Sequence, residues 1–196
     1  MKKISLYIAG SVKKDINDAN NIFASDDIKN ELVKSINNFE VVIFDPNESK
    51  IFGDSESFRF GQDCLQVISS NFIVVDLREK RGLGVGAEMM LAKERGIPII
   101  SVCPSNSHYR RSLVFHTGVK NDDWTHPFVE SLSDAIVESF SEAGEWIKNY
   151  ISNPTEIKSG RIVEELIKGY MENLLEKDPD FKKKYEYSLK DKLVLK

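Results

Sequence analysis

Residues 72–88 read FIVVDLREKRGLGVGAE, and this stretch decides the fold. It begins with an apolar run, 72–77, that is rich in β-branched residues. Such a short, near-continuous run is typical of a strand that is buried on both faces of a parallel sheet. A glycine-rich turn follows and Glu88 ends the stretch, so we expect a strand, a turn and a helix in this order.

The same alternation extends over most of the chain. Three more apolar runs of strand length occupy residues 4–9, 41–44 and 97–102. The segments between the four runs have helix length and carry apolar residues at helical spacing, in 16–38, 57–70 and 84–95. Strand–helix–strand alternation with short connections predicts right-handed crossovers in an α/β fold. We therefore expect a flavodoxin-like (Rossmann-like), doubly wound parallel sheet of four to five strands.

The end of this domain is less regular in sequence. Residues 127–129 could form a short fifth strand. Ser133 and Asp134 would then cap a helix that holds Ile136, Phe140 and Ile147.

Residues 153–196 differ from the rest of the chain. Asn153 and Pro154 interrupt the alternation, and an amphipathic stripe begins at Ile162. Ten basic and nine acidic residues follow from Thr155 onward, so the charge is mixed. We expect an α/β domain over 1–152, which carries the activity, and a helical C-terminal extension over 153–196.

Composition excludes several classes of protein. The 196 residues include 27 basic and 31 acidic ones, a net charge of −4, which argues against binding to a nucleic-acid polymer through a basic face. The two cysteines and three histidines show no metal-ligand spacing, so neither a metal nor a cofactor is expected. The apolar run after Met1 ends at Gly10 and is too short for a secretory signal. No run reaches the length of a membrane span, so we expect a cytoplasmic protein without membrane contact.

Ligands of doubly wound sheets bind beyond the carboxyl ends of the strands. This rule selects four loops, at 10–14, 45–54, 78–88 and 103–111. The third loop is the most informative, because glycines let a backbone approach a ligand closely and a helix N-terminus offers free N–H groups. We expect Glu88 in the first helical turn, where the helix dipole favours its ionised form, as a carboxylate nucleophile requires.

Two other interpretations of this loop remain open. Gly82, Gly84 and Ala87 fit a dinucleotide-binding pattern, but that pattern also needs an acidic residue at the end of the next strand, and 99–103 supplies none. Glu88 could also be an ordinary acid placed by the helix dipole.

Asp63 is the natural partner of Glu88. It lies near the start of the preceding helix, whose N-terminal end faces the same edge of the sheet. Two carboxylates at one cleft suit the cleavage of a glycosidic bond, where one attacks and the other handles a proton. A solvated or capping role for Asp63 is the alternative.

The residues 7–11 (YIAGS), Asp63, and 82–88 followed by Ala92 carry a resemblance. In order and spacing, from Ile4 to Trp146, the chain resembles the nucleoside 2-deoxyribosyltransferase superfamily, and its motifs are closest to those of 2'-deoxynucleoside 5'-phosphate N-hydrolases. The resemblance implies that Glu88 attacks the anomeric carbon and forms a glycosyl-enzyme ester. It further implies that Asp63 assists departure of the base and that Tyr7 positions Glu88 or the sugar.

The resemblance also implies a substrate-binding set, namely Gly10, Ser11, Lys13, Asp45, Gly82, Gly84, Gly86 and Ser112. Ser11 and Lys13 would hold a 5'-phosphate, and the hydroxyl of Ser112 would reach the site, even that of a neighbouring subunit. Asp45 could contact base or sugar, although Asp45-Pro46-Asn47 is equally a turn. The family has a serine or an aspartate six residues before the nucleophile, where this chain has Gly82.

The resulting prediction is cleavage of the N-glycosidic bond of 2'-deoxynucleosides or their 5'-monophosphates. Ser11, Lys13 and the Arg110–Arg111 pair favour hydrolysis of a monophosphate over transfer to another base. A nucleotide-binding or sensing module without turnover is the alternative from a different class, and a dinucleotide-dependent oxidoreductase is a third. The partner would be a small nucleoside or nucleotide, and the resemblance implies a homodimer or higher homo-oligomer.

Overall fold

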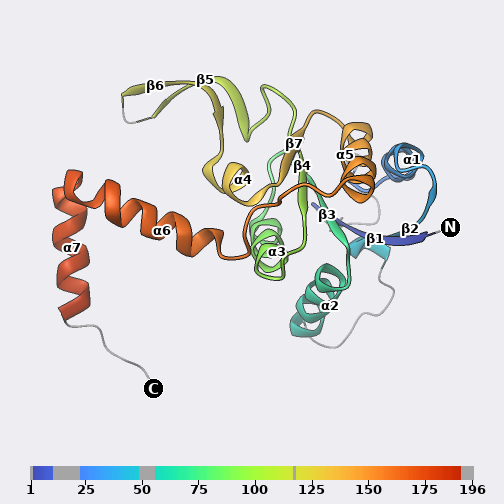
Figure 1. The fold of residues 1–196 in the computed structure, drawn as a ribbon, viewed down its shortest axis with the longest axis horizontal. Coiled ribbons are helices and arrows are strands. Elements are labelled where there is room, and N and C mark those ends of the chain that lie inside the picture. The colour runs from blue at the N-terminus through green and yellow to red at the C-terminus, as the bar shows by residue number, and fades with distance from the viewer. Residues whose placement is uncertain (1, 11–22, 49–55, 117, 191–196) are drawn as a thin grey trace. The chain divides into compact units, whose positions relative to one another are not determined.

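The computed structural model describes residues 2–10, 23–48, 56–116 and 118–190. Its central sheet has five parallel strands in the order β2-β1-β3-β4-β7 (Figure 1). These strands are β1 (Lys2–Ala9), β2 (Phe39–Phe44), β3 (Phe72–Asp76), β4 (Ile99–Val102) and β7 (Ala135–Val137). The order is the flavodoxin-like one, so the predicted fold is confirmed.

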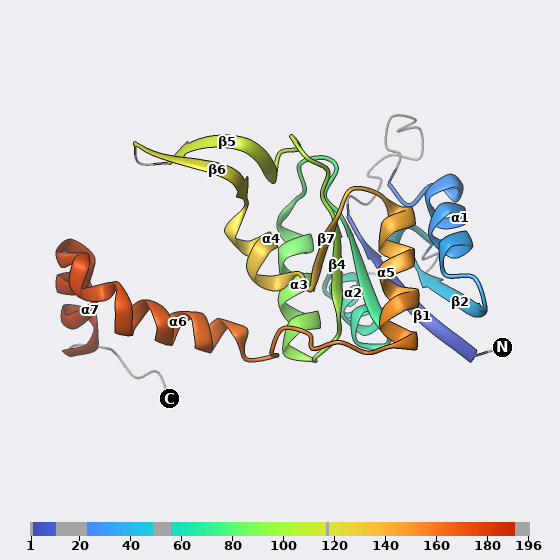
Figure 2. The ribbon, with the colours of Figure 1, turned by 45° about the horizontal axis from the view of Figure 1, so that its top comes forward.

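Helices cover both faces of the sheet. The helices α1 (Asp26–Ser35) and α5 (Phe140–Ser152) pack together on one face, and α2 (Glu56–Ile68) and α3 (Leu83–Glu94) pack together on the other (Figure 2). The predicted helices 57–70 and 84–95 match α2 and α3 within two residues. In the predicted segment 16–38, the described part forms α1.

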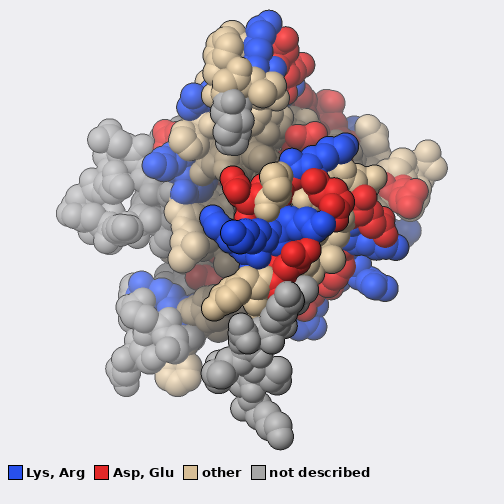
Figure 3. Space-filling model, turned by 90° about the vertical axis from the view of Figure 1, so that its left-hand side faces the viewer, with Lys and Arg blue, Asp and Glu red and all other residues tan. Residues whose placement is uncertain are grey.

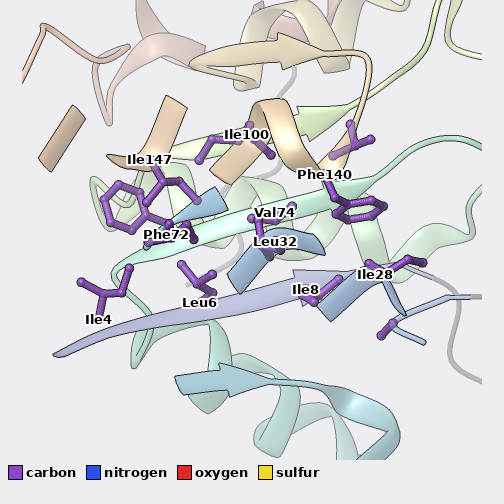
Figure 4. Packing of buried hydrophobic residues seen from close by; sticks show 14 of the residues in the cluster. Ile4, Leu6, Ile8, Ile28, Leu32, Phe72, Val74, Ile100, Phe140 and Ile147 are labelled. Carbon is purple, nitrogen blue, oxygen red and sulfur yellow. The ribbon is translucent and has the colours of Figure 1, made fainter. Parts of the chain in front are cut away.

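The main hydrophobic core lies between the sheet and the α1–α5 layer. Leu6 and Ile8 of β1 are fully buried there, in contact with a cluster that includes Leu32 of α1 and Ile147 of α5 (Figure 4). Each such buried side chain contributes roughly 1.5–3 kcal/mol through the hydrophobic effect. Because side chains alternate along a strand, Tyr7 points to the other face, toward α3.

Gly144 allows α1 and α5 to approach closely. A Cβ at this position would lie 2.6 Å from Cβ of Ser35 and 2.9 Å from the backbone oxygen of Leu32. A larger residue would therefore separate the two helices.

The structure corrects the prediction for the end of the domain. Residues 127–129 are not a strand but the start of α4 (Pro127–Leu132), because Pro127 at the first helical position is pre-organised for a helix. The fifth strand is β7 instead, and α5 begins only at Phe140. Its N-cap is Ser139, which accepts a hydrogen bond from the N–H of Glu142 at 3.2 Å, rather than Ser133.

A second, two-stranded sheet was not predicted. Strands β5 (Arg110–His116) and β6 (Val119–Thr125) form an antiparallel hairpin that leaves the domain at the carboxyl edge of the central sheet (Figure 2). The backbone at Gly118 has φ of +82°, a conformation that glycine adopts readily. The signal in the sequence was this glycine between the apolar residues 113–115 and Val119.

The chain divides into two compact units, 1–160 and 161–196. The second unit contains α6 (Ile162–Asn173), a 3₁₀ turn (Leu175–Lys177) and α7 (Pro179–Lys190), and it begins at 161, whereas the predicted extension begins at 153. Basic and acidic side chains lie beside one another on the face shown in Figure 3. The assignment of the activity to 1–152 stays a prediction. Among the described residues, no helix combines the length and apolar character needed to cross a bilayer.

Candidate active site

Tyr7 on β1 and Glu88 on α3 form the centre of the candidate site. Tyr7 of β1 is fully buried, and its hydroxyl donates a hydrogen bond of 2.9 Å to Oε1 of Glu88 on α3. The other carboxylate oxygen of Glu88, Oε2, is also buried but has no hydrogen-bond partner among the described residues. One oxygen of this carboxylate is thus held in place by Tyr7, and the other makes no hydrogen bond within the described part of the chain.

The environment of Glu88 differs from the sequence prediction. Helix α3 begins at Leu83 after the N-cap Gly82, so Glu88 lies in the second turn, beyond the first-turn position that we expected. Burial raises the pKa of Glu88 from 4.5 to about 7, with a further increase from the charge of Asp63, against the hydrogen bond from Tyr7, which lowers it. Near neutral pH the carboxylate therefore exchanges its proton readily, which is the range that acid–base and nucleophilic catalysis require.

Asp63 lies on α2 close enough for its charge to act on Glu88, but it is the eighth of the 13 residues of this helix, whereas we expected it near the start. Its pKa is raised by burial, while the charge of Arg59 acts in the opposite direction. The neighbouring Cys64 thiol also has a raised pKa, caused by burial and by the charges of Asp63 and Glu88. The pKa of Tyr7 rises for the same reasons, first burial, then Glu88, and also Asp63 and Asp45. The structure therefore brings Tyr7, Asp63 and Glu88 together.

A buried ion-pair network holds the turn before α3. Asp76, at the end of β3, is fully buried and binds Arg78 at 2.9 Å and Arg81 at 2.8 Å. Although burial alone would raise it, the pKa of Asp76 lies below its usual value because of these two guanidinium groups. The Arg78 guanidinium also lies 5.0 Å from the ring centre of Phe140. The Tyr109 hydroxyl accepts a hydrogen bond of 2.7 Å from the N–H of Arg81.

Gly82, the N-cap of α3, and the helical residues Gly84 and Gly86 leave space open at the start of α3. A Cβ at Gly82 or Gly86 would meet nothing within 4 Å, and one at Gly84 would lie 3.9 Å from Oε1 of Glu88. None of the three has a positive φ, so the backbone conformation does not require glycine. An open surface beside Glu88 fits the predicted binding of a ligand here, which remains a prediction.

Asp45 and Gly10 have clear structural roles. Asp45 is buried; one carboxylate oxygen binds Lys29 at 2.8 Å, and the other accepts hydrogen bonds from the backbone and side chain of Asn47. A Cβ at Gly10 would lie 2.2 Å from the ring of Phe23, so only glycine fits. Contacts of either residue with a substrate remain a prediction.

Of the residues predicted to bind a phosphate, some lie within the described part of the chain and others do not. Ser11 and Lys13 lie outside the described residues. Ser112 is exposed on β5, and within the described part of the chain it makes no hydrogen bond to Tyr7, Asp63 or Glu88. Arg110 pairs with Glu138 at 2.7 Å, so part of its charge is already neutralised.

Sequence reasoning did not identify Asp76, Arg81 and Tyr109 as parts of the site. The sequence signal for Asp76 was its place as an acid at the end of a buried apolar run. Nothing in the sequence indicated Tyr109. No group of three or more potential metal ligands occurs among the described residues.

Comparisons with known proteins support the fold. No family model matches the chain, and no curated protein matches it either. Two solved structures have a TM-score of 0.51. One is a 2-deoxyribosyltransferase from Bacillus psychrosaccharolyticus, with 12% identity over 79% of this chain and 98% of that chain. The other, from Leishmania mexicana, has 16% identity over 78% of this chain and 99% of that chain. At these identities the likeness shows the α/β fold.

Proposed function

We propose that the chain cleaves the N-glycosidic bond of 2'-deoxynucleosides or their 5'-monophosphates. In this proposal Glu88 forms a covalent glycosyl-enzyme intermediate, and the sugar passes to water or to another base. Two solved structures of the same fold are 2-deoxyribosyltransferases, which supports this class of reaction.

The proposal rests on the different surroundings of the two carboxylate oxygens of Glu88. Its Oε1 accepts a hydrogen bond from the buried Tyr7, while its Oε2 is buried without a partner among the described residues. A buried polar atom without a partner costs roughly 1–3 kcal/mol, and such a cost is common where the atom has a chemical role. A nucleophile needs a fixed orientation and an oxygen that no other group engages, and the arrangement of Glu88 supports this role.

In the first step, the ionised carboxylate of Glu88 attacks C1' of the sugar. The bond between C1' and the base nitrogen breaks, and its electron pair stays with the base. Asp63 donates a proton to the departing base, a role that its raised pKa supports because more of it is protonated near neutral pH. The products of this step are the free base and a glycosyl ester on Glu88.

In the second step, Asp63 acts as the base and takes a proton from the acceptor. Water attacks C1' and breaks the ester bond, so the sugar leaves and Glu88 is again a carboxylate. If a second base takes the place of water, the product is a new nucleoside. We propose hydrolysis of a monophosphate as the main outcome, with Ser11 and Lys13 as the phosphate contacts.

A substrate panel tests this proposal. The protein is incubated with the common 2'-deoxynucleosides, ribonucleosides and their 5'-monophosphates, with and without a second base. Chromatography then identifies free base, free sugar or sugar phosphate, and any new nucleoside. We expect base release from at least one 2'-deoxy substrate, and a mass increase equal to the sugar moiety on a peptide that contains Glu88 after rapid acid quenching.

Glu88→Gln is the test variant, and Glu94→Gln is its matched control on the exposed end of the same helix. We expect the first to lose activity by at least about a thousandfold, as removal of a nucleophile does, and the second to keep it. Base release that survives in Glu88→Gln would refute the covalent role. Tight nucleotide binding by calorimetry without base release over hours would identify a binding module instead.

We also propose that the chain forms a homodimer or a higher homo-oligomer. Four large apolar side chains on α2 are exposed in the single chain, at 73% for Phe58, 65% for Phe60, 60% for Leu65 and 44% for Ile68. Large exposed apolar side chains that lie together commonly mark an interface. Light scattering on the full chain is the test, and a monomer at micromolar concentration would contradict this proposal.

A further inference from the structure

Tyr109 links the start of the β5–β6 hairpin to the turn that carries Glu88. Its hydroxyl accepts a hydrogen bond from the Arg81 N–H at 2.7 Å and lies 3.4 Å from the Arg81 carbonyl oxygen, to which it donates. Arg81 directly precedes Gly82, the N-cap of α3. One side chain therefore binds both polar groups of a single backbone residue at the entrance to the helix.

The side chain of Arg81 is held at the same time. It is 4% exposed, forms an ion pair with Asp76 and also donates a hydrogen bond from Nε to the Asp76 carbonyl oxygen. Asp76 fixes the guanidinium end of Arg81, and Tyr109 fixes its backbone. Between Arg81 and Glu88, three residues are glycines without side chains and Val85 is buried in α3. Arg81 is therefore the last residue before the helix whose side chain is held by an ion pair and a hydrogen bond.

Tyr109 is itself fixed by an aromatic cluster at the base of the hairpin. Its ring packs edge-on against His108, with centroids 4.8 Å apart, and against His126, at 5.7 Å. The ring of His126 also contacts Trp124 of β6, and the N–H of His126 donates to the carbonyl oxygen of Tyr109 at 2.8 Å. The Tyr109 hydroxyl therefore has a defined position that depends on both strands of the hairpin.

We infer that Tyr109 is a positioning residue for the reaction: it fixes the N-terminus of α3, and with it the reactive oxygen of Glu88, and it makes this geometry dependent on the hairpin. The inference rests on the proposed function. Tyr109 is not a catalytic residue, because it acts on the proposed nucleophile through Arg81 and the first turns of α3. A displacement of about 1 Å at a reacting atom can lower a rate by about a hundredfold, so a contact at this distance from the chemistry can affect turnover.

The test variant is Tyr109→Phe, which keeps the ring contacts and removes only the hydroxyl. Amide hydrogen exchange followed by NMR reports on the hydrogen bond directly, and steady-state kinetics with the best substrate of the panel report on turnover. We expect exchange at the Arg81 amide to become about tenfold faster and kcat to fall about five- to tenfold, as loss of one neutral hydrogen bond allows. The rise in KM should be smaller.

Tyr170→Phe is the matched control, since it removes a hydroxyl that binds Asp178 within the C-terminal unit. It should change neither the exchange at Arg81 nor kcat. A melting temperature for each variant shows that it is folded. Faster exchange at Arg81 with unchanged kcat would overturn the positioning role, and unchanged exchange would show that the hydrogen bond does not hold the turn.

A readout that needs no turnover separates this inference from the proposed function. The side-chain carboxyl of Glu88 can be titrated by NMR in both proteins. If the hydroxyl of Tyr109 holds the turn, the Tyr109→Phe variant exposes Glu88 more and lowers its pKa from about 7 toward the ordinary value. If the wild-type protein releases no base but this pKa shift occurs, the proposed function fails and the positioning of Glu88 by Tyr109 stands. An unchanged pKa counts against the positioning role.

Discussion

Helix α3 carries two charged residues that are shielded from solvent, Glu88 in its middle and Lys93 in its last turn, and their surroundings differ. Lys93, in the last turn, has a side chain only 2% exposed and pairs with Asp134 at 2.7 Å. Asp134 also accepts hydrogen bonds from the backbone N–H groups of Ile99 and Lys158. Glu88, five residues earlier, has no cation among the described interactions and one hydrogen bond, from Tyr7.

We propose that this difference separates a structural charge, Lys93, from a reactive one, Glu88. A buried ion pair whose remaining polar groups are satisfied holds elements together, because breaking it leaves an uncompensated charge. A buried carboxylate with a free oxygen and a pKa near 7 destabilises the folded protein at neutral pH. Such a cost is typical of active sites. The contrast within one helix therefore supports the assignment of Glu88.

The largest effect on stability is expected at the satisfied pair. Asp134→Asn leaves Lys93 buried without a counter-charge, so we expect a loss of about 3–5 kcal/mol in the free energy of unfolding. Urea denaturation measures it. The control is Glu40→Gln, which breaks an exposed pair with Lys3 and should cost less than about 1 kcal/mol. Equal losses of unfolding free energy in the two variants would contradict a structural role for the Lys93–Asp134 pair.

The reactive carboxylate should behave in the opposite way. The pKa of Glu88 is higher in the folded than in the unfolded protein, so its stabilising contribution is complete below pH 4.5 and is lost as the pH rises through about 7. Glu88→Gln avoids this loss. We expect the variant to match the wild type near pH 4 and to exceed it at pH 8 by up to roughly 3 kcal/mol. Urea denaturation across this pH range is the measurement, and a destabilised variant at pH 8 would contradict the prediction.

Tyr7 should set the pH at which Glu88 becomes active. The wild-type kcat/KM should rise with pH around a midpoint near 7, as Glu88 ionises. The Tyr7 hydrogen bond lowers the pKa of Glu88, so Tyr7→Phe should raise this pKa and move the midpoint to higher pH. At pH 7 we expect a loss of about fivefold or more in kcat/KM, from one hydrogen bond to a charged group. A profile that keeps its midpoint would show that Tyr7 does not tune Glu88.

Much of the fold follows from local pattern. The runs at 72–77 and 97–102 contain strands because near-continuous apolar segments rich in β-branched residues fit the centre of a parallel sheet. The hairpin was missed because β5 and β6 mix charged and apolar residues without the alternation of a strand that has one buried face. Residues 127–129 were misassigned because a three-residue apolar run does not distinguish a strand from the first turn of a helix, and the role of Pro127 was overlooked.

Of the candidate site, the sequence predicted the location, at the edge of the sheet where the parallel strands have their carboxyl ends. Because carboxyl ends of parallel strands share one edge, sequence order alone placed Asp63 and Glu88 together, and the resemblance added Tyr7. The pKa of Glu88 was not predictable, since it depends on burial and on the true start of α3. The contact of Tyr109 with Arg81 joins residues 28 positions apart, and nothing in the local sequence of either indicates it.

The smallest expected effect on stability comes from a substitution at Gly86. Gly86 lies within α3, and a Cβ there meets nothing within 4 Å. Gly86→Ala should therefore stabilise the protein by roughly 1 kcal/mol, the difference in helix propensity. Gly144→Ala is the contrasting variant, because its Cβ would lie 2.9 Å from a backbone oxygen and must destabilise. If substrate lies against the glycines, Gly86→Ala gains stability but raises KM. A more stable Gly86→Ala enzyme with unchanged KM would show that the open surface beside Glu88 is not where the substrate binds.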